Sequence, residues 1–477
     1  MILYGAGNRC LVLVHLMEIC NMPISHIVDG DSNKWGFKVG CHNVEPSDIL
    51  AEEQTSKICI TASSFLGIQE IRRKLTCDYQ IDDNREVSFY DLVMEIYNLL
   101  IEKGTFPLKL PVSGDHYSII FDCQFGLGLG GIEEWTKSIC REFKQHGEYT
   151  PYILTNGQNY DIPEELTENI LYADLKRENA FSIHNVQEII TCVCRHLPCV
   201  LVTSQPDDVL LAGKILKKEF GDLVKVVSGI RGGYAEISQS YIAMKSCTDM
   251  YLCVNSQIRL DMIRRGVCAD IVHTMLCPVE CPQILTRDYS LNENSPIHIG
   301  YAGRIEVEEK RMDLLMQVVE ELETMHLNYE LELAGEGRYE SMISYFSASH
   351  GCQNRIKMIG RIERESIPQF WSNKDICVNI SDHEGRSRST LEAMAHGAVP
   401  IVTETSGVHD DIIDGVNGYI VPVGAYKKMA EQIAVLCKDR KRLPRMGYKA
   451  HEELRNKCCM KDHYEFLKAK IEQVIAI

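Results

Sequence analysis

The chain has 477 residues, of which 45% are hydrophobic and 25% charged, and its formal net charge is −17. This length exceeds what one hydrophobic core supports, so about three domains are expected. The negative charge makes nucleic acid a poor partner, because phosphate binding depends on clustered Lys and Arg. No apolar run reaches the ~20 residues that span a bilayer, and the first residues do not have the pattern of a signal peptide.

Residues 1–107 are the first predicted domain, in which strands alternate with helices as in a parallel α/β unit. The stretch from Lys103 to Tyr117 contains two Pro and two Gly and is expected to be a linker. The predicted strands are Ile2–Tyr4, His26–Val28 and Ile58–Ala62, and the predicted helices are Arg9–Cys20, Gly67–Leu75 and Ser88–Glu102.

The start of this domain resembles a dinucleotide-binding fingerprint. Gly5 and Gly7 lie between the first strand and its helix, and Asp29 ends the second strand, where an acid can bind a ribose. Cys10 stands where the third glycine is usual. The sequence therefore leaves open a nucleotide site at these residues or a degenerate scaffold without a ligand.

The second predicted domain covers residues 116–285. Its first strand, Ser118–Asp122, leads into a glycine-rich run at 125–131 and then a helix, Ile132–Gln145. Alternation of strands and helices continues to about Met275, which predicts another parallel sheet. The further strands are expected at Tyr152–Thr155, Cys199–Thr203 and Lys225–Ser228.

The third predicted domain, residues 286–460, has the strongest α/β alternation and is expected to be doubly wound. The remaining segment, 461–477, is expected to be a helix that packs back on the second domain. The predicted strands are His298–Ala302, Glu330–Ala334, Ile356–Ile359, Ile376–Ile380 and Val399–Thr403, and the helices are Met312–Met325, Tyr339–Ser349, Ile367–Ser372 and Ser389–His396. Two such domains in tandem bind ligands between the carboxyl edges of their sheets.

The stretch from Ser381 to Glu392 carries the candidate chemistry. Glu384 follows a predicted strand, Gly385 lets the backbone approach a ligand, and Glu392 lies on the next helix. The N–H groups at that helix start can hold phosphate, and carboxylates accept hydrogen bonds from the hydroxyls of a sugar or ribose. From the spacing alone, a solvated helix face is an equally good interpretation.

Cations and glycines also follow the neighbouring predicted strands. Each of them alone is more often a turn or a surface charge, but together they favour a polyphosphate site in which Arg304 and Lys310 neutralise a diphosphate without a metal. These residues are Gly303, Arg304, Lys310, Gly335, Gly337, Gly360 and Arg361.

These motifs resemble the large retaining glycosyltransferase family four, which has the GT-B fold, over Ser118 to about Ile475. The matching stretches are SDHEGRSRSTLEAMAHGAVPIV, the GR and KR of Gly303 to Arg311, AGEG at Ala334, DGVNGYIVP at Asp414 and GGIE at Gly130. The fold class implied is α/β, with two doubly wound Rossmann-like domains and an additional N-terminal Rossmann-like domain.

The resemblance also implies residue roles. Arg304 and Lys310 would bind the diphosphate, Glu384 the sugar hydroxyls and Glu392 the ribose, with Arg231 near the reacting sugar. The backbone around Gly360–Ile362 would contact the base. The implied donor-binding residues are Gly130, Gly131, Gly303, Gly335, Gly360, Arg361, Ile362, Gly385, Arg386, Ser387 and Glu392.

The implied reaction moves a sugar from a nucleotide-diphosphate-sugar to an acceptor hydroxyl with retention of configuration and without a metal or cofactor. The implied acceptor is a glycan or lipid-linked sugar in cell-surface or capsular polysaccharide synthesis. The expected location is the cytoplasm, with peripheral contact at the inner membrane face.

Three positions depart from the family pattern. The segment from Arg304 to Lys310 is one residue longer than usual, Arg231 stands where many relatives carry a His, and Ser406, Gly407 and Asp410 replace the usual Gly pair and Glu. The first departure makes the role of Lys310 less secure, and the second puts the usual catalytic His in doubt.

Two other functions stay open. An NAD-dependent oxidoreductase could use the N-terminal domain, although the strand at Tyr152–Thr155 is followed by Asn156 and Gly157 rather than by an acid. A sensor that binds a nucleotide sugar without catalysis would keep the same motifs.

The chain contains 20 cysteines at scattered spacings, which are expected to be reduced and mostly buried. Cys192, Cys194, His196 and Cys199 could ligate a metal. The helical spacing of this stretch favours an apolar helix face instead.

Overall fold

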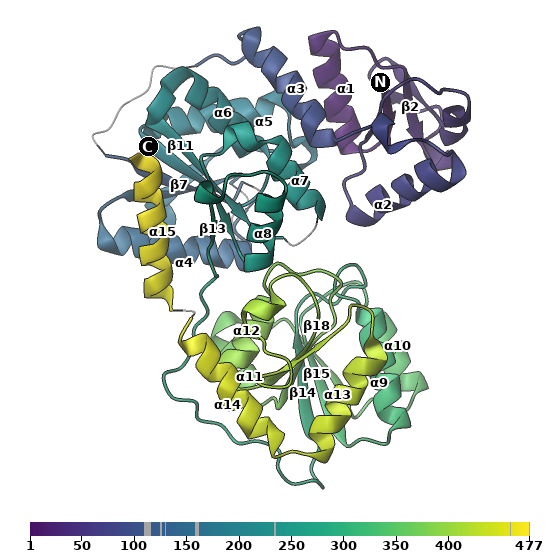
Figure 1. Cartoon of the computed structure of the whole chain (residues 1–477), viewed down its shortest axis with the longest axis vertical. Helices are drawn as coiled ribbons and strands as arrows, with labels where there is room; N and C mark the ends of the chain where they lie inside the picture. The colour runs from purple at the N-terminus through teal and green to yellow at the C-terminus, as the bar shows by residue number, and fades with distance from the viewer. Residues whose placement is uncertain are drawn as a thin grey trace. The chain divides into compact units, whose positions relative to one another are not determined.

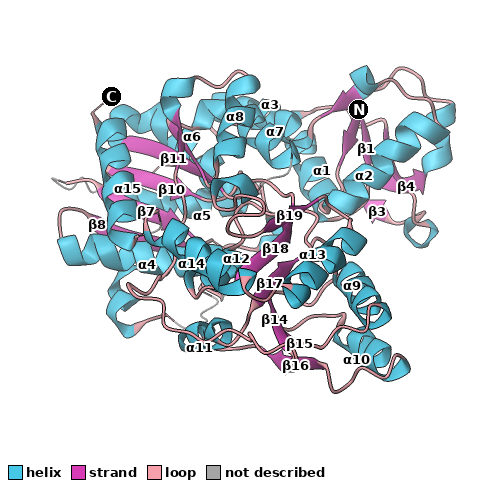
Figure 2. Ribbon diagram, turned by 60° about the horizontal axis from the view of Figure 1, so that its bottom comes forward, coloured by secondary structure: helices cyan, strands magenta, loops and turns pink. Residues whose placement is uncertain are grey.

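The computed structural model describes residues 1–108, 116–124, 126–128, 130–157, 162–232, 235–457 and 459–476. These residues form three sheets with flanking helices (Figure 1, Figure 2), which confirms the predicted α/β class. The chain divides into two compact units, of which the first comprises Met1–Gly229, Gln239–Tyr251 and Ile471–Ile477, and the second Ile230–Ser238 and Leu252–Lys470. Residues 109–115 of the expected linker, and Phe125 and Leu129 of the glycine-rich run, lie outside the described residues.

The N-terminal sheet has the strand order β3-β4-β2-β1-β5-β6. Its strands are parallel except for β3, which pairs antiparallel with β4 in a hairpin absent from the predicted elements. Strand β1 is buried on both faces, which explains its unbroken apolar sequence. The strands are β1 Ile2–Tyr4, β2 His26–Asp29, β3 Lys38–Val39, β4 His42–Pro46, β5 Ile58–Ile60 and β6 Glu86–Val87, and the helices are α1 Asn8–Cys20, α2 Phe65–Arg73 and α3 Phe89–Glu102.

The middle sheet has the order β13-β12-β11-β10-β7-β8-β9, so the chain reverses direction across the sheet between β7 and β10. Pairings from β11 through β10, β7 and β8 to β9 are all parallel. The strands are β7 Ser118–Asp122, β8 Thr150–Thr155, β9 Ile170–Tyr172, β10 Cys199–Thr203, β11 Val224–Ile230, β12 Met250–Cys253 and β13 Val272–Thr274, and the helices are α4 Gly131–His146, α5 Ile183–Val193, α6 Asp208–Phe220, α7 Ala235–Ala243 and α8 Ser256–Arg264.

The third sheet has the order β16-β15-β14-β17-β18-β19 and is parallel throughout. Helix α9 packs against α13, and α12 packs against α11 and α14 (Figure 1). The strands are β14 Ile297–Ala302, β15 Tyr329–Ala334, β16 Ile356–Gly360, β17 Ile376–Asn379, β18 Val399–Thr403 and β19 Tyr419–Val421, and the helices are α9 Met312–Thr324, α10 Glu340–Ser349, α11 Ile367–Ser372, α12 Arg388–Ala395, α13 Tyr426–Lys438, α14 Arg442–Arg455 and α15 Met460–Ile475.

The third sheet is the doubly wound arrangement that the sequence predicts. In chain order its strands run 3-2-1-4-5-6, so β14 and β17 are neighbours whose following loops diverge to opposite sides. In open α/β sheets, ligands bind in the crevice that opens at such a reversal, beyond the carboxyl ends of the strands. The loops after β14 and β17 are therefore the first place to look for a site.

Candidate functional site

Glu384 lies in the loop after β17, at the reversal of the third sheet. Its Oε1 accepts from Lys310 Nζ at 2.6 Å, from Ser381 Oγ at 2.8 Å and from Asn379 Nδ2 at 3.3 Å. Lys310 belongs to the loop after β14, so the ion pair joins the two diverging loops. The side chains of Lys310 and Glu384 are 19% and 15% exposed, which leaves both accessible to a ligand. Sequence reasoning predicted this pair of residues but not the two polar partners, Asn379 and Ser381.

Three predicted glycines, Gly303, Gly335 and Gly360, lie in neighbouring loops that backbone hydrogen bonds join at this edge of the sheet. The N–H of Gly303 donates to the carbonyl of Ala334, and the N–H of Gly335 donates to the carbonyl of Gly360. A β-carbon at Gly335 would overlap the carbonyl oxygen of Gly303. The loops after β14 and β15 therefore pass each other at a distance that a side chain at Gly335 would prevent.

Arg304 is also at this edge, and 56% of its side chain is exposed. Its Nη1 donates to Glu306 and its Nη2 donates to Glu309, each at 2.8 Å. The two cations that the sequence assigns to a diphosphate, Arg304 and Lys310, are thus both bound by carboxylates in the structure.

Helix α12 begins one residue earlier than predicted and is capped by Ser387. The Ser387 hydroxyl accepts from the Thr390 N–H at 3.4 Å and from Asn379 Nδ2 at 2.9 Å. In the second turn, Glu392 accepts from Arg388 Nε at 2.9 Å. Burial raises the pKa of Glu392, against the opposing effect of Arg388.

The guanidinium of Arg386, predicted to bind the donor, is almost completely buried. Its Nε and Nη2 donate to the two carboxylate oxygens of Asp411 at 2.8 and 2.6 Å, and its Nη1 donates to the Cys277 carbonyl at 2.6 Å. The side chains are 1% and 5% exposed. The side chain therefore holds the loop in place, and a contact with the donor at this position would come from the backbone.

Replacing Arg386 with Ala is expected to destabilise the second compact unit by about 3–5 kcal/mol, because it leaves the Asp411 carboxylate buried without its cation. Denaturant unfolding measures this loss as a lower midpoint. The double variant Arg386→Met with Asp411→Leu removes both charges and should lose much less. Equal losses in the single and double variants would contradict this account.

Arg231 approaches the same loop through its backbone. A β-carbon at Gly385 would overlap the carbonyl oxygen of Arg231, so this position requires glycine. The Gly385 carbonyl accepts from Asn255 Nδ2 at 2.5 Å, and Arg231 Nη1 donates to Cys277 Sγ at 3.2 Å. Asn255 was missed from the sequence, because it follows a short strand, β12, that the pattern did not predict.

The remaining residues predicted to bind the sugar donor are Arg361, Ile362, Gly130 and Gly131. Arg361 is exposed, and Ile362 packs partly buried against the cluster that contains Trp371. Gly130 caps helix α4, and Gly131 is its first residue. A side chain at Gly130 would meet the carboxylate of Glu133.

In the N-terminal domain, Asp29, the acid of the predicted dinucleotide-binding fingerprint, already accepts hydrogen bonds from the protein. Asp29 accepts from the Ala6 N–H at 2.7 Å, the Asp31 N–H at 2.9 Å and Lys34 Nζ at 2.9 Å. Burial acts to raise the pKa of Asp29, but Lys34 and the two N–H groups outweigh it and lower that pKa. Gly5 has a left-handed φ of 110°, and Gly7 caps α1. The carboxylate that would bind a ribose thus stabilises the turn between β1 and α1.

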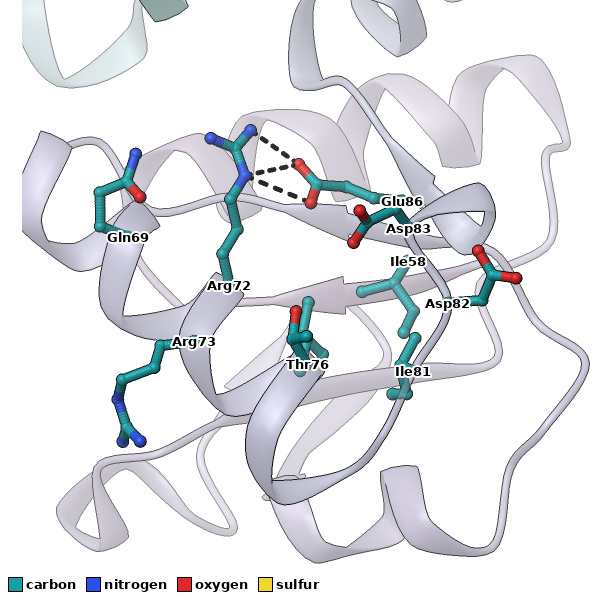
Figure 3. Close-up of a pocket in the computed structure, with 10 residues that line it drawn as sticks. Ile58, Gln69, Arg72, Arg73, Thr76, Ile81, Asp82, Asp83 and Glu86 are labelled. Carbon is teal, nitrogen blue, oxygen red and sulfur yellow. Dashed lines mark hydrogen bonds and ion pairs between the residues drawn. The ribbon is translucent and has the colours of Figure 1, made fainter.

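A pocket of about 260 Å³ lies elsewhere in this domain (Figure 3). Arg72 on α2 forms a bidentate ion pair with Glu86, the first residue of β6, and the buried side chain of Ile58 begins β5. The pocket is therefore at the amino ends of these strands, whereas Gly5 and Asp29 lie at the carboxyl ends of β1 and β2.

Three aspartates follow the neighbouring strands β7 and β10 of the middle sheet. Asp122, Asp207 and Asp208 are 5%, 5% and 0% exposed. Burial raises the pKa of Asp122 and of Asp208 to about 7, and it also raises the pKa of Asp207, to which the charges of the other two contribute. Asp208 accepts from the Phe181 N–H at 2.5 Å and from Asn185 Nδ2 at 3.1 Å. We call these residues the buried aspartate cluster.

The cysteine stretch that could have held a metal has other contacts. Cys192 Sγ lies 3.2 Å from the Tyr172 carbonyl, and the ring of His196 packs on Tyr152. Cys194 and Cys199 are buried. Among the described residues, the side chains of Glu18, Cys41 and His42 are the one group of three potential ligands that come together. Within the residues that the structure describes, no helix is both long and apolar enough to cross a bilayer.

Comparison with known proteins matches residues 285–453 to the family model described as Glycosyl transferases group 1. The capsular polysaccharide biosynthesis glycosyltransferase CapM of Staphylococcus aureus is 29% identical over 168 residues, 35% of this chain and 43% of that protein. The lipopolysaccharide 1,6-galactosyltransferase of Escherichia coli K12 is 26% identical over 308 residues, 62% of this chain and 82% of that protein. The chain spans less than half the length of several curated relatives that it matches, CapM among them.

Solved structures share the fold at lower identity. Anabaena Alr3699/HepE in complex with UDP-glucose covers 75% of this chain and 100% of that chain, with a TM-score of 0.61 and 14% identity. The S. aureus TarM structure covers 100% of this chain and 99% of that chain, with a TM-score of 0.51 and 12% identity. These likenesses confirm the GT-B fold, and residues 285–453 form a domain of the group 1 glycosyl transferase family.

Proposed function

We propose that this protein is a retaining, metal-independent glycosyltransferase that moves a sugar from a nucleotide-diphosphate-sugar to an acceptor hydroxyl. The observation that carries the proposal is the ion pair between Lys310 and Glu384, which lies at the carboxyl edge of a doubly wound sheet where its chain order reverses. The group 1 family match over the same domain supports it.

The two cations suit a diphosphate. Arg304 and Lys310 are paired with carboxylates, which a diphosphate would replace as their partner. Arg and Lys both form strong charge-assisted hydrogen bonds to phosphate oxygens. Their combined charge can neutralise the leaving group without a metal ion.

The carboxylates suit the rest of the donor. Among the contacts of the described residues, those of Glu384 all use Oε1, so Oε2 is available to a sugar hydroxyl. Glu392 lies farther along on α12, where it can accept from ribose hydroxyls. Arg231 adds a cation beside the reacting sugar, in place of the usual His.

The proposed reaction depends on electrostatic stabilisation of the departing diphosphate, which is usually the largest catalytic contribution. The acceptor hydroxyl then loses its proton to that phosphate on the same face of the sugar, which retains the configuration. CapM is named for capsular polysaccharide biosynthesis and the E. coli enzyme for lipopolysaccharide, which supports a glycan or lipid-linked acceptor.

The oxidoreductase alternative receives less support. Its nucleotide would need Asp29, and this carboxylate is held by Ala6, Asp31 and Lys34. A sensor without activity is distinguished from an enzyme only by assay.

A thermal-shift screen of UDP, GDP, ADP and their sugars tests the proposal. At least one nucleotide is expected to raise the melting temperature of the wild-type protein, because ligands that bind only the native state stabilise it by mass action. The stabilising donor is then assayed for nucleotide release with and without candidate acceptors. Activity should persist in excess chelator. Stabilisation by none of these ligands would refute the donor assignment, and stabilisation without turnover would favour the sensor.

A further inference from the structure

The loop between β14 and α9 holds two residues in an unusual backbone conformation. Glu309 has φ 63° and Arg311 has φ 51°, both in the left-handed region that non-glycine residues avoid. Such a conformation is strained and persists only where the surrounding structure fixes it. Lys310, which pairs with Glu384, lies between them.

The Arg311 guanidinium is bound on two sides. Its Nη1 donates to both carboxylate oxygens of Asp382 at 3.0 Å, and its Nε and Nη2 donate to the two oxygens of Asp313, also at 3.0 Å. Its hydrogen bonds to Asp313 and then to Asp382 raise the pKa of Arg311. These contacts use all three nitrogens of the guanidinium, so the side chain is held by protein partners on both sides.

Asp382 contacts both neighbours of Lys310. Its N–H donates to the Glu309 carbonyl at 2.8 Å, and its carboxylate binds Arg311. Two residues later in the same loop, Glu384 binds Lys310 itself. Three consecutive residues after β14 are thus joined to two residues after β17, which fixes the alignment of the two loops.

We propose that Arg311 is a positioning residue that acts through Asp382 to hold Lys310 and Glu384 in the relative position that the donor requires. The proposal rests on the proposed function and assigns Arg311 no direct contact with the substrate. A Lys side chain has a long flexible stem, so the direction of its ammonium group depends on where its backbone is held. The left-handed conformation of Arg311 is the local strain that this alignment requires.

The first test is kinetic. Arg311→Gly and Asp382→Asn are each expected to lower kcat/KM for the donor by about 10–100-fold, since small displacements of positioning groups have effects of that order. The double variant should be no worse than either single variant, because both remove the same contact. Asp313→Asn removes the other carboxylate from the same guanidinium and should change kcat/KM by less than about threefold, as expected for a partly exposed pair.

Replacing Arg311 with glycine separates the effect on the position of Lys310 from an effect on the stability of the protein. Glycine adopts the left-handed conformation without strain, so Arg311→Gly should keep the melting temperature close to that of the wild type while activity falls. Arg311→Ala carries the strain without the ion pairs and should lower both. Full activity in Arg311→Gly would overturn the proposal.

The second test needs no donor. Lys310 labelling by an amine-reactive ester, followed by mass spectrometry, is expected to be slow in the wild type and several-fold faster in Arg311→Gly and Asp382→Asn. Lys357, which is 48% exposed on β16, should label at the same rate in all variants. Unchanged labelling of Lys310 refutes the positioning role. Faster labelling in a protein that no nucleotide stabilises refutes the proposed function and leaves the loop alignment established.

Discussion

Replacing Lys310 with Ala is expected to lower kcat by about 10²–10³-fold, the usual effect of removing one preorganised group that stabilises charge in the transition state. The change removes a cation from the leaving diphosphate and also leaves Glu384 without its ion-pair partner. Steady-state release of the nucleotide diphosphate, with the donor found in the thermal-shift screen, measures the effect.

Lys357→Ala is the matched control for this experiment. It removes the same charge from the same domain, but Lys357 pairs with Glu330 on the adjacent strand β15. Its activity should equal that of the wild type. Lys310→Arg retains the charge and should keep part of the activity. If Lys310→Ala turned over as fast as Lys357→Ala, the diphosphate role of Lys310 would have to be abandoned.

The second large expected effect is on stability and depends on pH. In the buried aspartate cluster, Asp122 and Asp208 have a pKa of about 7, whereas the ordinary value is 3.8. Between these values the native protein holds protons that the unfolded chain has released, so stability falls as the pH rises through this window. From pH 5.5 to 8 the loss should be about 2 kcal/mol for Asp208, and Asp122 and Asp207 should add to it.

Hydrogen exchange of peptides from β7 and β10, followed by mass spectrometry in low denaturant, localises this loss to the middle sheet. Asp208→Asn cannot ionise and should reduce the pH dependence. Asp313→Asn, a change of the same type in the second unit, should leave it unaltered. A middle sheet equally stable at pH 5.5 and pH 8 would contradict the raised pKa values.

The sequence predicts the long buried strands best. Ile119, Ile120 and Phe121 are consecutive apolar residues because β7 is covered on both faces. The strands that went unpredicted are short or polar. In the hairpin of β3 and β4, each strand has a single valine among mostly polar residues, and β6 has only two residues. Such strands are defined by the strands with which they pair, and the local sequence pattern does not indicate those partners.

The candidate site likewise contains residues that the sequence predicts and contacts that it does not indicate. Glu384 and Lys310 are predictable because each follows a strand that the pattern identifies, and a parallel sheet brings those strand ends together. The partner of Arg386 is Asp411, and 25 residues separate the two, so nothing local indicates that this guanidinium is buried. The left-handed conformation of Arg311 is likewise a property of the folded loop.

The contact between Arg311 and Asp382 has a consequence for how related sequences vary. A chain with glycine at position 311 adopts the same backbone without strain but has no guanidinium for an acid at position 382 to bind, so another contact must align its two loops. A chain with arginine at 311 needs that acid to hold the loop. The two positions should therefore change together across relatives, even though they are far apart in the sequence.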